Sequence, residues 1–140
     1  FLYTLFLMSK SQSGDSAMLT QEGHIFLDEQ KEIERLAAKG PAIFLGHCAA
    51  GALKSYPGVV KVFIRANEED KKKRIIKDYA IPERQAEAVR KKYDNKRSRY
   101  FYANTARRWT DLRNYDMILD SSGLGMDGCV TVLKSLIDRS

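Results

Sequence analysis

Hydrophobic and polar positions along the chain form blocks that predict alternating helices and strands. Phe26, Ile33 and Leu36 recur at helical spacing, and charged residues cover the positions between them. Four apolar residues then follow without a polar break at 42–45, with glycine and proline on their flanks. A short continuous apolar run of this kind is typical of a strand buried on both faces. The pattern therefore predicts a helix over 25–39 and a buried strand over 42–45.

The later blocks continue this alternation. Residues 1–8 fit a helix or a buried strand equally well, whereas 9–23 are polar and rich in Ser, Gly and Gln, which is typical of a mobile loop. An irregular connection is expected at 109–114. The remaining predicted elements are a short helix at 49–54, a strand at 59–64, a helix capped by Asn67 and ending at Tyr79, a long helix from Pro82 to Thr105, a strand at 115–119 and a helix at 127–138.

This order of elements predicts an α/β fold with a parallel sheet, because alternating strands and helices pair through right-handed crossovers. Three strands make a thin sheet, so we expect an earlier strand that this chain does not contain. Ligands of such sheets bind beyond the carboxyl ends of the strands, where Gly46, His47 and Cys48 follow the strand at 42–45. The alternative is a tight turn with no binding role, in which Gly46 is needed only because glycine has a freer backbone than other residues.

Length and composition indicate one globular domain over residues 1–140. No apolar run is long enough to span a bilayer, and the apolar start lacks the basic segment of a signal peptide, so we expect no membrane partner. The chain begins with Phe1, not Met, so we expect it to start inside a longer one. Its two cysteines, Cys48 and Cys129, fit no metal spacing and indicate reduced thiols of a cytoplasmic protein.

Positive charge is concentrated in one part of the chain. Residues 61–113 contain 17 of the 24 Lys and Arg but only 8 of the 18 Asp and Glu. Such a block indicates a polyanionic partner: nucleotide phosphates, nucleic acid or an acidic surface. The alternative is the solvated outer face of ordinary helices.

Four stretches are similar to a known family, in the same order along the chain. They are Gly-Pro-Ala-Ile-Phe-Leu-Gly-His-Cys-Ala-Ala at 40–50, a strand and basic helix at 60–74, a basic segment at 93–102 and Trp-Thr-Asp-Leu-Arg-Asn-Tyr-Asp-Met-Ile-Leu-Asp-Ser-Ser at 109–122. This succession resembles the bacterial cytidylate kinases and their cytidylate kinase-like relatives. The resemblance implies a three-layer α/β/α P-loop fold with helices on both faces of a parallel sheet, and 67–108 as lid and basic helices.

The resemblance also implies an activity and a set of site residues. Enzymes of this kind use ATP and Mg²⁺ to move the terminal phosphoryl group to a nucleoside monophosphate. Phosphoryl transfer needs positive charge around the migrating group, so a basic block is chemically appropriate. The implied roles are catalysis for Lys71, Arg74 and Arg97, binding of the acceptor for Gly46, His47, Asp94 and Arg99, and binding of the nucleotide for Arg74, Asp120 and Ser121.

Several positions depart from the family pattern. The phosphate-binding loop Gly-x-x-x-x-Gly-Lys-Ser/Thr does not occur in this sequence. Either it precedes Phe1, which the thin sheet favours, or the protein does not bind ATP in the family's way. His47 replaces an arginine, Cys48 replaces the aspartate of true cytidylate kinases, and only Asp94 remains of a charged motif on the basic helix. The sequence therefore does not identify the acceptor nucleotide.

Two further hypotheses belong to other classes. The chain could be a catalytically inactive kinase-like binding protein, or a nucleic-acid-binding protein that uses its basic helices and their aromatic residues. We rank nucleic acid well below a nucleotide as the partner, because the aromatic residues form no recognised motif. Single residues could also have purely structural roles in place of functional ones. The Lys and Arg side chains would then cover a solvated helix face, and Asp120 would form an Asx turn. The sequence does not indicate an oligomeric state.

Overall fold

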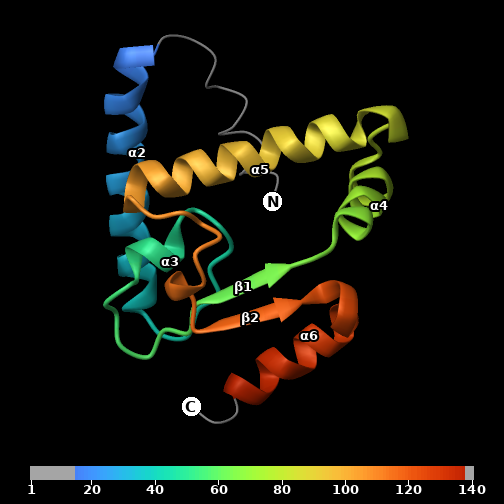
Figure 1. Ribbon diagram of the computed structural model, residues 1–140. Coiled ribbons are helices and arrows are strands. Elements are labelled where there is room, and N and C mark those ends of the chain that lie inside the picture. Colours follow the sequence, from blue (N-terminus) through green and yellow to red (C-terminus); the bar gives the residue numbers. More distant parts are fainter. Residues whose placement is uncertain (1–14, 138–140) are drawn as a thin grey trace. The chain divides into compact units, whose positions relative to one another are not determined.

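The computed structural model describes residues 15–137, with side chains from residue 25 onwards. The chain divides into two compact units that meet in sequence at Leu53 and Lys54, an N-terminal unit and a C-terminal unit. The elements, in chain order, are α2 (Asp15–Ala37), α3 (Ala49–Ala52), β1 (Val62–Arg65), α4 (Glu68–Tyr79), α5 (Glu83–Thr105), the 3-10 helix η1 (Leu112–Asn114), β2 (Met117–Asp120) and α6 (Ser121–Ile137) (Figure 1).

Helix α2 is longer than the sequence pattern predicts. It begins at Asp15, so the loop prediction was wrong from that residue onwards, while 1–8 and 9–14 lie outside the described residues. Polar composition alone does not interrupt a helix, and this stretch contains no proline. Gly23 costs only about 1 kcal/mol in a helix interior relative to alanine. The predicted short helix is confirmed as α3.

The predicted buried strand at 42–45 was wrong. Its residues form no strand, and Ile43 and Leu45 are 82% and 81% exposed. A strand requires a neighbour that satisfies its backbone hydrogen bonds, and an apolar sequence cannot supply that neighbour. In the part of the chain that is described, only β1 and β2 pair with each other.

Strands β1 and β2 form a two-stranded parallel sheet in the C-terminal unit, in place of the three strands expected. Val62 lies opposite Met117, and Arg65 lies opposite Asp120. Before the strands, the backbone N–H of Asp116 donates to the Lys61 carbonyl (2.8 Å). Helix α6 contacts both strands. The parallel pairing is therefore confirmed, although the strands are shorter than predicted and are shifted towards their carboxyl ends.

An aromatic cluster lies beside β1. The ring of Phe63 is 5.8 Å from that of Trp109, edge to face, and 4.9 Å from that of Tyr115. The Tyr115 hydroxyl donates to the Trp109 carbonyl (2.7 Å), and the Asn114 side chain donates to the Arg108 carbonyl (2.8 Å). These contacts hold the connection between α5 and β2, in which η1 is the one regular turn.

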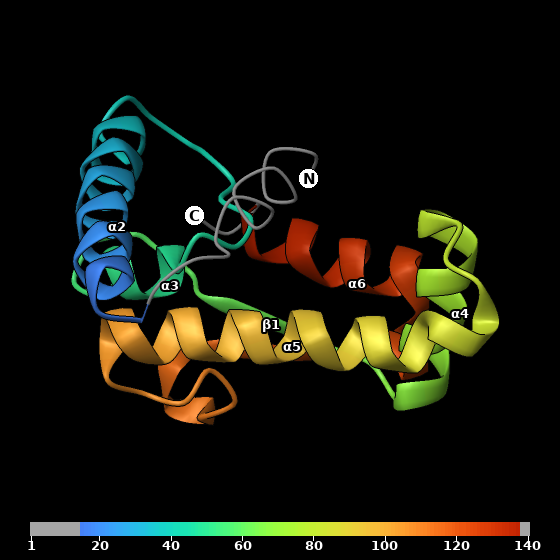
Figure 2. The same cartoon turned by 90° about the horizontal axis from the view of Figure 1, so that it is seen from above.

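Helices α4 and α5 follow the predicted bounds closely. Asn67 caps α4, and its Oδ1 accepts a hydrogen bond from the Asp70 N–H (2.8 Å). Ala80, in the left-handed conformation, ends α4 after Tyr79. Pro82 is the N-cap of α5, so this helix begins at Glu83, one residue later than predicted. The two helices contact each other, and Figure 2 shows α4 beside the start of α5.

Helix α6 begins earlier than expected. It follows β2 directly at Ser121, and Gly125 (φ 69°, ψ 174°) interrupts it. The predicted start at 127 corresponds to the segment after this break. The chain is thus a mixed α/β protein, mostly helical, with a small parallel sheet, while the three-layer arrangement and the single domain stay predictions. Among the described residues, no helix has the length and apolar character needed to cross a membrane.

The cap of α4 can be tested by mutation. Asn67→Ala should lower the free energy of unfolding by about 1 kcal/mol, because the Asp70 N–H loses its acceptor. Urea unfolding followed by circular dichroism measures this loss. Asn67→Ser keeps a side-chain acceptor and should stay within about 0.5 kcal/mol of the wild type. Equal losses for both variants would contradict this role of Asn67.

Candidate functional site

The carboxyl ends of β1 and β2 form a polar edge. The guanidinium of Arg65 donates to Oδ2 of Asp120 (2.9 Å), directly across the strand pair. The hydroxyl of Ser121 donates to the Arg65 carbonyl (2.9 Å). One step further, the Asn67 N–H donates to the Ser122 hydroxyl (2.9 Å), which joins the start of α4 to the start of α6. Open parallel sheets bind ligands at this edge.

Asp120 has a structural role within that edge. Its Oδ1 accepts a hydrogen bond from the Ser122 N–H (3.0 Å), which is the Asx turn expected as the alternative. This bond and the Arg65 guanidinium keep the pKa of the Asp120 carboxyl below its usual value. Asp120 and Ser121 are thus at the expected edge, where both stabilise the turn out of the sheet.

Arg74 of α4 contacts helix α6, which follows β2. Its Nη2 lies 3.0 Å from the sulfur of Met126, just after the break in α6, and its Nε is 3.9 Å from the Asp78 carboxylate. Lys71 lies one turn earlier on α4, and its Nζ is 3.3 Å from Glu68. Of the predicted cations, Arg74 is therefore the one that contacts the segment after β2.

The other predicted residues of the C-terminal unit lie on α5. Arg97 donates to Asp94 through Nη1 (3.2 Å). Arg99 is exposed, and its side chain makes no hydrogen bond or ion pair with another described residue. Asp94 also accepts a hydrogen bond from Arg90 (3.1 Å). The acidic and basic residues of this helix therefore interact with each other before any ligand is considered.

Arg90 is a functional candidate that the sequence analysis missed. Its side chain is only 13% exposed and lies 2.6 Å from Glu68 of α4, 2.9 Å from Glu87 and 3.1 Å from Asp94. These carboxylates, Glu87 foremost, raise the pKa of the Arg90 guanidinium. The spacing of Glu87, Arg90 and Asp94 at three and four residues predicts the contacts within α5. The contact with Glu68 depends on how the two helices pack.

The N-terminal unit contains Gly46, His47 and Cys48, which have φ angles of 72°, 51° and 54°. This is a left-handed turn into α3, in which the two non-glycine residues each cost roughly 1–2 kcal/mol. Nδ1 of His47 is 3.1 Å from Glu29 of α2, and both side chains are largely buried. Glu29 is one of the charged residues expected between the apolar positions of this helix, but its side chain is only 20% exposed. Its spacing from Phe26 indicates the apolar face instead.

Cys48 is not an activated thiol. It is buried, and burial raises its pKa to about 11, with the nearby Glu29 carboxylate acting in the same direction. A thiol in this state is a poor nucleophile at neutral pH.

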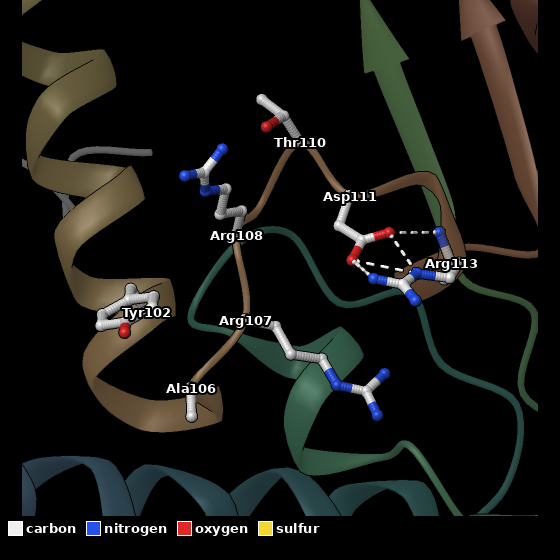
Figure 3. Close-up of a pocket in the computed structure, with 7 residues that line it drawn as sticks. All are labelled: Tyr102, Ala106, Arg107, Arg108, Thr110, Asp111 and Arg113. Carbon is white, nitrogen blue, oxygen red and sulfur yellow. Dashed lines mark hydrogen bonds and ion pairs between the residues drawn. The ribbon is translucent and has the colours of Figure 1, made fainter.

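A hollow of about 740 Å³ lies on the amino-terminal side of β2 (Figure 3). Three arginines surround it, and Asp111 binds one of them, Arg113, through both carboxylate oxygens (3.0 and 2.7 Å). The Arg113 guanidinium holds the pKa of Asp111 at about 2. No predicted site residue lines this hollow. Its lining residues are Tyr102, Ala106, Arg107, Arg108, Thr110, Asp111 and Arg113.

These features define a class of protein before any comparison. It is a mixed α/β protein in which two charged helices, α4 and α5, follow the first strand of a small parallel sheet. The chain belongs to the cytidylate kinase-like family, which matches residues 1–123. The resemblance inferred from the four stretches is thereby confirmed.

A crystal structure of an uncharacterized protein from Eubacterium ventriosum ATCC 27560 has a similar fold. The TM-score is 0.77 at 24% sequence identity, and the match covers 83% of this chain and 66% of that one. The chain therefore spans about two thirds of the length of that protein. At this identity the likeness shows the fold alone. The comparison with curated proteins returned no match.

The state of Cys48 can be measured by alkylation. At pH 8 a thiol with a pKa of about 11 is roughly 0.1% thiolate, so its reaction with iodoacetamide should be slow and should accelerate about tenfold per pH unit. Mass spectrometry of the labelled peptides separates Cys48 from Cys129. Chain unfolded in guanidinium is the control and should titrate near 9. A folded-state midpoint below pH 9 would show that the thiol is not buried as described.

Proposed function

We propose that the protein is a nucleotide kinase that transfers the terminal phosphoryl group of ATP to a nucleotide acceptor. The observation that carries this proposal is the match to the cytidylate kinase-like family over residues 1–123. The position of Arg74 supports it, because this side chain contacts Met126 of α6, the helix that directly follows the carboxyl end of β2. Ligands of open parallel sheets bind beyond the carboxyl ends of the strands.

The three proposed catalytic cations suit phosphoryl transfer. Lys71, Arg74 and Arg97 now face carboxylates of their own helices, at 3.3, 3.9 and 3.2 Å. Exposed ion pairs of this kind contribute about 0–1 kcal/mol. Hydrogen bonds from arginine or lysine to phosphate are among the stronger ones in proteins. The phosphates of a nucleotide can therefore replace the carboxylates as partners of these cations. The cations then stabilise the charge that develops on the migrating group.

This proposal assigns a role in acceptor binding to Gly46 and His47 of the N-terminal unit, and to Asp94 and Arg99 of the C-terminal unit. His47 presents an imidazole held beside Glu29, where the family pattern has a guanidinium. A single ring nitrogen cannot bind a phosphate in the bidentate way of arginine. We therefore propose an acceptor within the nucleoside monophosphates and leave its base open.

The nucleotide would lie along Arg74, Asp120 and Ser121 and would carry Mg²⁺ on its phosphates. Magnesium neutralises charge on the transferring phosphoryl group and is commonly bound through phosphates with only one or two carboxylates. The described residues contain no group of three or more His, Cys, Asp or Glu suited to a metal. The three proposed catalytic cations, Lys71, Arg74 and Arg97, fit the phosphates of such a complex rather than a bare metal ion.

A transfer assay on the full-length protein tests this function. ATP, Mg²⁺ and each common nucleoside monophosphate are mixed with the protein, and ADP formation is measured. Transfer to at least one acceptor is expected, and Arg74→Ala should lower kcat/KM by about 100-fold or more, because a cation at the migrating group is lost. Arg84→Ala removes an exposed arginine near the start of α5 and should leave the rate unchanged.

Two other outcomes would sink the kinase proposal. Binding of ATP without transfer to any acceptor would identify an inactive kinase-like binding protein. Absence of nucleotide binding, together with steeply salt-dependent binding of oligonucleotides, would favour the nucleic-acid hypothesis.

A further inference from the structure

Arg90 occupies a position unlike that of the other cations on α4 and α5. Its guanidinium contacts carboxylates from both helices: Glu68 of α4 at 2.6 Å, and Glu87 and Asp94 of α5 at 2.9 and 3.1 Å. The side chain is 13% exposed, so water screens these contacts less than those on the surface. Arg90 is therefore the strongest ionic link between the two helices among the described residues.

Two of these carboxylates also contact cations that the proposed function places at the phosphates of the nucleotide. Glu68 lies 3.3 Å from Lys71, and Asp94 lies 3.2 Å from Arg97. An unbroken series of ion pairs thus connects Lys71 on α4 to Arg97 on α5, and Arg90 is its centre. Each carboxylate is shared between a partly buried arginine and a more exposed cation.

Glu68 and Asp94 each form two ion pairs, and the pair with Arg90 is the stronger of the two. The side chains of Lys71 and Arg97 are 34% and 49% exposed, and each meets its carboxylate three residues away on the same helix, which is a weak pair. Arg90, at 13% exposure, donates charge-assisted hydrogen bonds to Asp94 and Glu87. Its contact with Glu68 is an ion pair at 2.6 Å, in which the carboxylate is 65% exposed. An arriving phosphate would therefore displace Glu68 and Asp94 from Lys71 and Arg97, but not from Arg90.

We propose that Arg90 is a positioning residue that retains Glu68 and Asp94, so that Lys71 and Arg97 are available to the phosphates of a nucleotide. This inference rests on the proposed function, which assigns Lys71 and Arg97 to phosphate. Without Arg90, the carboxylates of Glu68, Glu87 and Asp94 are matched only by Lys71, Lys91 and Arg97, and an incoming phosphate meets a cluster with no net positive charge.

Binding of inorganic tripolyphosphate to the full-length protein, measured by calorimetry at fixed salt, tests Arg90 without requiring catalysis. Arg90→Met should weaken binding about tenfold or more, because one unit of charge is lost near a highly charged ligand. Adding Glu68→Gln to Arg90→Met should restore the affinity to within about threefold of the wild type, because the freed carboxylate is neutralised. Glu68→Gln alone should strengthen binding, because one negative charge near the ligand is removed. Arg84→Met is the matched control and should bind like the wild type.

Several results would overturn the role of Arg90: no binding to the wild type, unchanged binding to Arg90→Met, or a loss that Glu68→Gln does not restore. The last result would mean that Arg90 acts through packing alone. If Arg90→Met does not unfold cooperatively, Arg90→Lys takes its place, and the same restoration is required. Failure of the kinase proposal is seen separately, as absence of transfer in a protein whose tripolyphosphate binding still depends on Arg90.

Discussion

The parallel register of β1 and β2 is the constraint on which the C-terminal unit depends. Lys61 meets Asp116 before the strands, and Arg65 meets Asp120 at their carboxyl ends. A shift of one residue would separate both pairs and turn every side chain of the moved strand to the opposite face. Because α4 begins three residues after Arg65 and α6 directly after Asp120, the register also fixes where both helices start.

The sequence predicted best those elements that local chemistry determines. Asn67 caps α4 through a hydrogen bond to a residue three positions away, and the helix ends at Tyr79 as expected. Helix α5 similarly begins directly after Pro82 and ends at Thr105. Parallel pairing was predictable too, because the order of strands and helices along the chain leaves few alternatives.

Features that depend on distant partners could not be predicted in the same way. The run at 42–45 has the composition of a buried strand, but no described strand pairs with it, and Ile43 is exposed. Arg90 belongs to a helix whose charges alone suggest a solvated surface, and its contact with Glu68 arises only when α4 packs on α5. The contact of Glu29 with His47 likewise depends on the turn that presents His47.

The basic block at 61–113 shows why net charge alone is an incomplete guide to a site. Its surplus of Lys and Arg indicates a polyanionic partner, but many of these cations already face carboxylates three or four residues away. Arg90 is bound to carboxylates on both helices, whereas the side chain of Arg99 contacts no charged group among the described residues. Under the proposed function, a phosphate would select among these cations by the strength of the ion pairs that it must break. The weak, exposed pairs of Lys71 and Arg97 would exchange readily, whereas the partly buried contacts of Arg90 would persist. The same carboxylates that lower the net charge would then decide which cations reach the ligand.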